Sequence, residues 1–279
     1  MVGREKIFLS DSDEWWHLFN YDNQNKYHML LVIINSDDLG ISPKVNDAVF
    51  DLMRMGKVTS ASLLANAPAV EDAATRQMHF PNCSFGVHLN LTEFKPLTNN
   101  PELSPLLAGT GEFSPKKVRS IHLNTSIQQA IFHEWMAQIE CLRALGVEPS
   151  HIDSHHHVHT IPGLFRTLKR VQKASGIYKV RQSMNFYGLQ KPSPLLLLKK
   201  QLWNLALRKI VHTETTQGFT DFSRFMGSSA MVAKTFRTVE LMTHPGSELF
   251  SDETDMLETD WHIQLPFEVR LISYLELRE

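Results

Sequence analysis

The chain has 279 residues, of which 42% are hydrophobic and 21% are charged, and its 28 basic and 30 acidic side chains leave a formal net charge of -2 at pH 7. This near-neutral balance argues against a basic nucleic-acid groove, and the mixed charges with ordinary apolar content exclude disorder of the whole chain. Two cysteines are too few for a disulfide framework, so we expect a reducing compartment.

The first 28 residues differ from the rest of the chain. They are polar, with Asp11, Asp13 and Glu14 followed by Trp15 and Trp16, and hold no apolar run of signal-peptide length. Eighteen uninterrupted apolar residues occur nowhere in the sequence, so we expect no membrane span and a soluble, cytoplasmic protein. Residues 1–28 are an N-terminal extension to which the sequence assigns no role. Residues 29–279 show no internal repeat or linker, and we expect them to form a single domain.

From Met29 onward, predicted strands and helices alternate. The apolar, β-branched run Met29–Ile34 predicts a buried parallel strand. Ser42 as N-cap and Pro43 at the first helical position predict a helix start, and Gly56 marks the end of that helix. The other predicted strands are Val58–Asn66, Ser84–Leu91, Ser150–Asp153, Tyr178–Gln182 and Val239–Thr243, and the other predicted helices are Ala69–Met78, Ser126–Leu145, Pro162–Lys173 and Pro194–Val211.

This alternation indicates an α/β fold built on a parallel sheet. A distorted (β/α) barrel, similar to a TIM barrel, fits better than an open dinucleotide-binding sheet, because Asp37 and Asp38 follow the first strand where such a sheet carries a Gly-x-Gly-x-x-Gly motif. The stretch Asn99–Asn124 is rich in Pro, Gly and Ser and reads as a long excursion from the barrel, and such excursions are usually functional.

Ionisable side chains gather where four predicted strands end. They are the pair Asp37-Asp38, His88, the segment 151–159 with Asp153 and five histidines, and His244. Each has an ordinary structural explanation by itself, such as a capping aspartate or a hydrogen-bonded core histidine. Five imidazoles within nine residues are harder to explain in that way, because histidine is the usual metal ligand and proton shuttle. Since the carboxyl ends of barrel strands line active sites, the four segments together predict one site.

These residue types suit a hydrolytic metal centre. One carboxylate and two imidazoles from three strand ends can hold an ion and leave positions open for water and substrate. A second carboxylate can act as general base and a separate histidine as proton donor. Neighbouring residues of an extended chain point in different directions, so Asp37 and Asp38 need not bind the same ion. Spacing alone does not choose among the clustered histidines: in a strand His155, His157 and His159 share one face, and in a helix His155 and His159 do.

Several of these segments resemble the motifs of the YdjC-like carbohydrate deacetylases, a family that includes chitooligosaccharide deacetylases. The resemblance runs in order from about Leu31 to Gly246 and implies a barrel hydrolase, similar to polysaccharide deacetylases, that uses one divalent metal to remove acetyl groups from N-acetylated amino sugars. The matching segments are Asn35-Ser36-Asp37-Asp38-Leu39-Gly40, Val58-Thr59-Ser60-Ala61-Ser62, Gly86-Val87-His88-Leu89-Asn90-Leu91-Thr92, residues 151–159, Thr215-Thr216-Gln217-Gly218-Phe219 and Met242-Thr243-His244-Pro245-Gly246.

The resemblance also implies roles for individual residues. Asp37 would be the general base, and Asp38, His88 and His155 would bind the metal. His244 resembles the histidine that serves as acid in the wider polysaccharide deacetylase group. Four further residues would orient these groups or contact substrate: Asp153, His157, His159 and Arg181.

The metal and the reaction leave alternatives open. The resemblance implies Mg²⁺, whereas two imidazoles and one carboxylate suit Zn²⁺ or another transition metal. Another metal-dependent hydrolase, such as a phosphoesterase, would need a second metal and a cationic phosphate clamp, and a non-catalytic sugar- or metal-binding protein would not need the second aspartate. We expect a small N-acetylated sugar as the partner, no nucleic acid and no membrane, and homodimer formation stays open. The resemblance is weakest in residues 1–28 and in the acidic region after Gly246, where specificity can differ.

Overall fold

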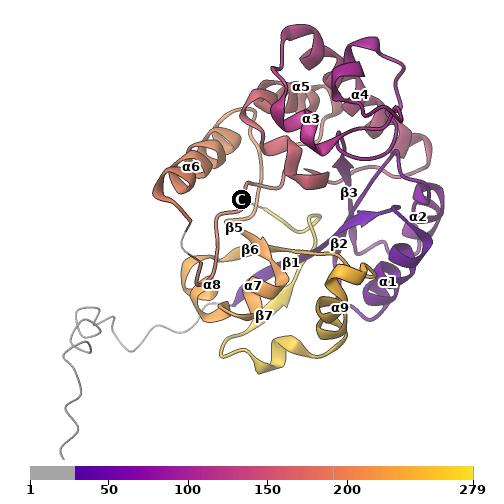
Figure 1. The fold of residues 1–279 in the computed structure, drawn as a ribbon. Helices are drawn as coiled ribbons and strands as arrows, with labels where there is room; N and C mark the ends of the chain where they lie inside the picture. Colours follow the sequence, from indigo (N-terminus) through magenta and orange to yellow (C-terminus); the bar gives the residue numbers. More distant parts are fainter. Residues whose placement is uncertain (1–28, 191, 279) are drawn as a thin grey trace, which may run out of the picture.

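The computed structural model describes residues 29–278 with the exception of residue 191; the predicted N-terminal extension lies outside this part. The centre of the fold is a curled parallel sheet of seven strands. Six of them follow the order β4-β3-β2-β1-β6-β5, and β7 pairs with the first residues of β1 (Figure 1). The helices form a ring around this sheet, and the predicted distorted (β/α) barrel is confirmed. The strands are β1 Leu30–Leu39, β2 Ser60–Leu63, β3 Ser84–Leu89, β4 Ile152–Ser154, β5 Gly218–Asp221, β6 Thr238–Thr243 and β7 Val269–Leu271.

The barrel is closed irregularly between β4 and β5. Residues 178–182 lie beside β4, where the Ile152 N–H donates to the Lys179 carbonyl and the Arg181 N–H donates to the Ile152 carbonyl, both at 2.9 Å. The sequence predicts a regular strand here, but the pairing consists of two isolated bridges, one from Val180 to Ile152 of β4 and one from Lys179 to Glu214. The closure places the Arg181 side chain in the interior, where none of it is exposed.

Local sequence signals explain the helices that were predicted. At the start of α1 the Ser42 hydroxyl accepts from the Val45 N–H, Pro43 is the first helical residue, and Gly56 beyond the end has a φ of +72°. The sequence did not predict β5, β7 and the last three helices, and residues 99–124 hold a 3₁₀ helix, Pro101–Leu106, and α3. The helices are α1 Pro43–Arg54, α2 Val70–Gln77, α3 Pro115–Ser120, α4 Thr125–Ala144, α5 Phe165–Ser175, α6 Pro194–Lys209, α7 Phe222–Met226, α8 Ser229–Thr235 and α9 Ser251–Glu258. Within the described part of the chain, no helix combines the length and the apolarity needed to cross a membrane.

The inward face of the sheet is polar and is built from small residues. Strand alternation puts Ser60 and Ser62 on one face of β2, and Ser84, Gly86 and His88 on one face of β3. The four polar side chains among them are each at most 1% exposed. Apolar side chains between the sheet and the helices form the main core, so the barrel interior is left for hydrogen-bonded and charged groups.

Gly86 shows how tightly this interior is filled. A Cβ atom at Gly86 would lie 2.5 Å from the His151 ring, which is itself stacked on Tyr274 with 3.8 Å between ring centroids. We therefore expect Gly86→Ala to lower the free energy of unfolding by about 1–3 kcal/mol, measured by urea denaturation. Gly109→Ala is the control, because a Cβ atom at this position meets nothing within 4 Å. Equal stability of the two variants would contradict the prediction.

Candidate active site

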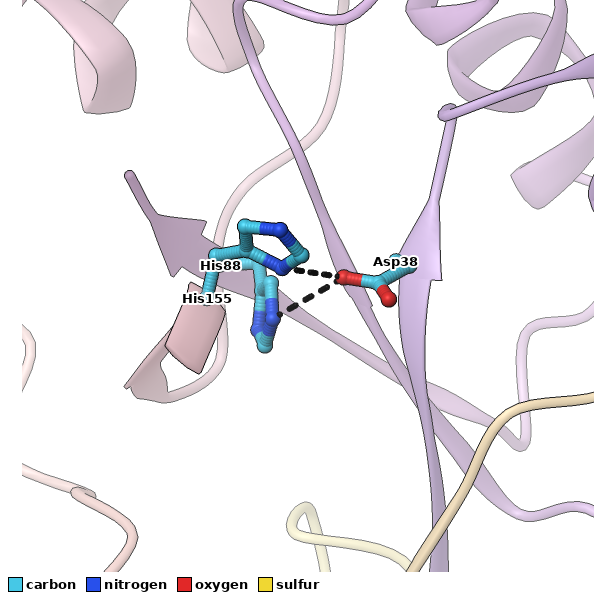
Figure 2. A group of neighbouring side chains, drawn as sticks. All are labelled: Asp38, His88 and His155. Atoms are coloured by element: carbon cyan, nitrogen blue, oxygen red, sulfur yellow. Dashed lines mark ion pairs between the residues drawn. The ribbon is translucent and has the colours of Figure 1, made fainter. Parts of the chain in front are cut away.

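Three of the predicted metal ligands meet at the carboxyl ends of the strands. Asp38 lies near the end of β1, His88 near the end of β3, and His155 directly after β4. Figure 2 shows both imidazoles pointing at one oxygen of Asp38: His155 Nδ1 lies 2.7 Å and His88 Nε2 lies 3.3 Å from Asp38 Oδ1. Asp38 has a left-handed backbone with a φ of +64°, which is uncommon for a residue other than glycine and turns its side chain away from the strand's regular alternation.

The chemistry of this cluster fits a divalent metal ion. Asp38 Oδ1 is buried and has no partner in hydrogen-bond geometry among the described residues, although two ring nitrogens lie close to it. Donor atoms bound at about 2.0–2.1 Å to a common ion lie roughly 3 Å from each other, which matches these two distances. Asp38, His88 and His155 can therefore hold one ion and leave further positions open.

A second group of potential ligands, Asp37, His88 and Asp153, does not fit a metal. The Arg181 guanidinium already lies between the two carboxylates, with Nη2 2.6 Å from Asp37 Oδ1 and Nη1 2.9 Å from Asp153 Oδ2. A metal ion there would place a second positive charge against a buried cation. The geometry thus supports one metal position.

Carboxylates hold the two histidines in place. Asp153 Oδ1 lies 2.7 Å from His88 Nδ1, and the Ser62 hydroxyl donates to Asp153 Oδ2 at 2.8 Å. Glu93 Oε2 lies 2.9 Å from His155 Nε2. These contacts leave His88 Nε2 and His155 Nδ1 to face Asp38, which is how carboxylates usually orient metal-binding histidines. Burial lowers the pKa of His88, but the charges of Asp153 and Asp37 outweigh this effect and raise it to about 10.

Asp37 is held apart from the cluster as a buried carboxylate. Its side chain is only 3% exposed, and Arg181 donates to both of its oxygens, at 2.6 and 2.7 Å. The Asn35 amide donates to Asp37 Oδ1 at 3.0 Å. Burial raises the pKa of Asp37, but the charges of Arg181 and His88 and the hydrogen bonds from Arg181 together outweigh burial and hold this pKa below its usual range. Asp37 therefore presents an ionised carboxylate beside the cluster of Asp38, His88 and His155.

His244 lies on the same cleft as the two aspartates. The cleft has a volume of about 310 Å³ and is lined by the N-terminal part of α1 and the loop after β6. The His244 ring stacks on Phe250 with 4.5 Å between centroids, and its backbone N–H donates to Glu253 Oε1 at 2.7 Å. The predicted general base, metal ligand and acid thus border one space, which is lined by Asp37, Asp38, Ile41, Ser42, Lys44, Val45, His244, Pro245, Gly246, Ser247 and Glu248.

Beyond β4, the histidine-rich segment continues through residues 155–159 as neither a strand nor a regular helix. It turns through two consecutive left-handed residues, His156 and His157, with φ of +50° and +55°. His157 packs edge-on against Phe219, and His159 Nε2 lies 3.0 Å from the Arg181 carbonyl. Burial lowers the pKa of His157 to about 3 and that of His159 to about 4. Both stay outside the ligand cluster, and His159 supports the backbone of Arg181.

Several residues that shape the site are not predicted from the sequence. Ser62 and Asn35 lie in segments that resemble the family motifs, but nothing in the sequence assigns them a role. Glu93 follows the His88 motif directly, yet nothing in its spacing connects it with His155. The Glu240 carboxylate, which accepts from Arg181 Nε at 2.8 Å, carried no signal beyond its place in a predicted strand.

Comparisons with known proteins identify the family of the chain and its fold relatives. The model of a family described as YdjC-like protein matches residues 31–268. A carbohydrate deacetylase of Brevibacillus brevis is 30% identical over 259 residues, which cover 89% of this chain and 93% of the relative. A chitooligosaccharide deacetylase of Salmonella paratyphi C is 29% identical over 219 residues, 77% of each chain. Among solved structures, a proposed cellobiose-phosphate cleavage protein of Enterococcus faecalis shares the fold, with a TM-score of 0.70 and 20% identity over 90% of this chain and 100% of that one.

The ligand cluster can be tested by metal binding alone. Asp38→Asn replaces a charged donor by a weaker neutral one, so we expect the affinity for Zn²⁺ or Mn²⁺, measured by isothermal titration calorimetry, to fall about 100-fold or more. Asp47→Asn on the exposed side of α1 is the matched control and should bind the ion as the unaltered protein does. An unchanged affinity in Asp38→Asn would remove this residue from the ligand set.

Proposed function

The chain belongs to the YdjC-like family, and on this basis we propose that it is a metal-dependent carbohydrate deacetylase that hydrolyses the acetamide of an N-acetylated sugar, such as a chitooligosaccharide, and releases acetate. One observation carries the proposal: the carboxylate of Asp37, which is paired with Arg181, borders the same cleft as Asp38. The names of the relatives support the reaction and the substrate class.

Asp38, His88 and His155 would hold the ion. When bound, a divalent cation supplies a Lewis acid for the acetyl carbonyl and lowers the pKa of a water molecule enough for a carboxylate of low pKa to serve as base. Two nitrogen donors favour Zn²⁺ or another transition metal, whereas the Mg²⁺ implied by the family resemblance prefers oxygen. Elemental analysis of protein purified without chelator separates these candidates.

Asp37 and His244 would move the protons. Asp37 accepts a proton from the attacking water, and Arg181 fixes both carboxylate oxygens so that the acceptor is oriented before substrate arrives. His244 donates a proton to the departing amine. The stack on Phe250 and the backbone bond to Glu253 hold His244 at the wall of the cleft. Each proton transfer typically contributes about 10²–10⁴-fold to the rate.

The alternatives fit the geometry less well. A phosphoesterase needs cationic groups that reach the phosphate, but Arg181 is fully buried against carboxylates, and Lys44 at the cleft is paired with Glu248 at 3.4 Å. A protein that binds sugar or metal without catalysis has no use for an ionised second carboxylate next to the donor set. A small N-acetylated sugar is the partner we propose, a cytoplasmic location stays a prediction from the sequence, and homodimer formation stays open.

Acetate release tests the proposed reaction directly. We expect the purified protein to release acetate from N,N′-diacetylchitobiose, to lose this activity in EDTA, and to regain it when one divalent ion is added back, because the ion supplies the electrophile. Acetate is measured with an enzymatic assay, and a panel of acetylated sugars covers the unknown chain length. If no sugar in the panel yields acetate with any ion, the non-catalytic binding function becomes the better explanation.

The two proton-transfer roles can be separated with different leaving groups. Asp37→Asn should lower kcat about 10²–10⁴-fold on both the sugar acetamide and 4-nitrophenyl acetate, while metal affinity is retained. His244→Gln should lower kcat about 10²–10⁴-fold on the acetamide alone, since 4-nitrophenolate leaves without a proton. Equal losses on both substrates in His244→Gln would contradict the acid role, and near-normal turnover in Asp37→Asn would contradict the base role.

A further inference from the structure

The C-terminal segment 272–278 places some of its side chains in the interior of the barrel, whereas Leu275 and Glu276 are exposed. Ile272 and Leu277 pack with Ile33 of β1, and Tyr274 is completely buried. The Tyr274 ring stacks on His151 at an interplanar angle of 11°. This segment follows residue 268, where the match to the family model ends.

A series of hydrogen bonds connects the Tyr274 hydroxyl with Asp37. The hydroxyl donates to Glu240 Oε2 at 2.6 Å, and Glu240 Oε1 accepts from Arg181 Nε at 2.8 Å. Arg181 then donates to both oxygens of Asp37. Tyr274, Glu240 and Arg181 are fully buried and Asp37 nearly so, which strengthens each bond and makes its loss costly.

A second series of hydrogen bonds starts from the backbone of the same tyrosine. The Tyr274 N–H donates to Ser84 Oγ at 3.0 Å, and Ser84 donates to Ser60 Oγ at 2.8 Å. Ser60 donates to Asn35 Oδ1 at 2.6 Å, and the Asn35 amide reaches Asp37 Oδ1 at 3.0 Å. Both series of hydrogen bonds connect Tyr274 with Asp37, so together they form a closed ring through the barrel interior.

We propose that Tyr274 and Glu240 are positioning residues for the deacetylation, and that through Arg181 they fix the proton acceptor Asp37. The role of Asp37 as proton acceptor rests on the proposed function. The hydrogen-bonded chain from Tyr274 through Glu240 and Arg181 to Asp37 does not depend on it. Glu240 occupies the Nε edge of the guanidinium and so keeps its two terminal nitrogens on Asp37 and Asp153. Without this partner the guanidinium is free to turn, and Asp37 turns with it.

The Tyr274 hydroxyl can be deleted without removing its ring. Tyr274→Phe keeps the stack on His151 and leaves Glu240 Oε2 without a donor, so we expect kcat for acetate release to fall about 10-fold with KM and metal affinity unchanged. Tyr178→Phe deletes a hydroxyl from an exposed tyrosine of the same chain and is the matched control. Unchanged kcat in a folded Tyr274→Phe variant would overturn the proposal.

Glu240 variants show whether the hydroxyl acts through this carboxylate. Glu240→Gln can still accept from Arg181 and should keep most of the activity, whereas Glu240→Met has no polar atom for either neighbour and should lose about 10- to 100-fold in kcat. In the Glu240→Met background, Tyr274→Phe should have no further effect, because the two residues act in series. Independent, multiplicative losses in the double variant would contradict the proposal.

A measurement of stability separates this inference from the proposed reaction. Tyr274→Phe and Asp37→Asn should shift the urea midpoint non-additively when combined, because both break the same ring of hydrogen bonds. This non-additivity does not depend on the substrate. If the midpoint shifts are non-additive but the unaltered protein releases no acetate, the result counts against the deacetylase function and leaves the hydrogen-bonded link between Tyr274 and Asp37 intact. Additive midpoints would overturn the connection itself.

Discussion

The interior of this barrel depends on one buried cation. Arg181 has no exposed surface, and it forms ion pairs with Asp37, Asp153 and Glu240, which are themselves nearly or fully buried. A buried carboxylate without a partner costs several kcal/mol or takes up a proton. Because a single guanidinium serves all three, each carboxylate is free to use its remaining lone pairs elsewhere: Asp153 on His88, Glu240 on Tyr274, and Asp37 toward the cleft. The same charge excludes a second metal ion from this part of the site.

The backbone conformation points the side chains of the adjacent residues Asp37 and Asp38 at different partners. Asp37 follows the alternation of β1 and shares the inward face with Asn35, whereas the left-handed conformation of Asp38 turns the next carboxylate toward His88 and His155. Such a conformation costs free energy and persists only where surrounding contacts fix it. Here it directs the Asp38 carboxylate to the two histidines and leaves the Asp37 carboxylate on Arg181.

The sequence predicted those parts of the molecule that local patterns determine. The first strand and the capped helix after Ser42 follow from an apolar run and capping residues, and the distorted barrel follows from the alternation of such elements. The end of the first strand was predicted too early, because β1 continues beyond Ile34 to Leu39 and includes Asp37 and Asp38. The histidine-rich segment was ambiguous because its real path, with two left-handed residues in succession, matches neither period. Contacts such as His155 with Glu93, or Glu240 with Tyr274, join residues 62 and 34 positions apart, so only the closed barrel brings them together.

The buried base of this site and the exposed segment around His244 differ in how readily their residues can be exchanged. The floor of the site is the network of buried hydrogen bonds that includes Ser60, Ser84 and Asn35. Small side chains on β2 and β3 make it possible, because they leave room in the barrel for charged groups and for Tyr274 of the C-terminal segment. The wall around His244 is instead a loop, and its neighbours Leu249 and Phe250 are 89% and 39% exposed. A floor held from several sides keeps the reacting groups in register, because moving any one of them breaks buried bonds. Exposed loop residues can be exchanged at little cost in stability, so differences in sugar specificity among proteins with this floor should arise in the wall.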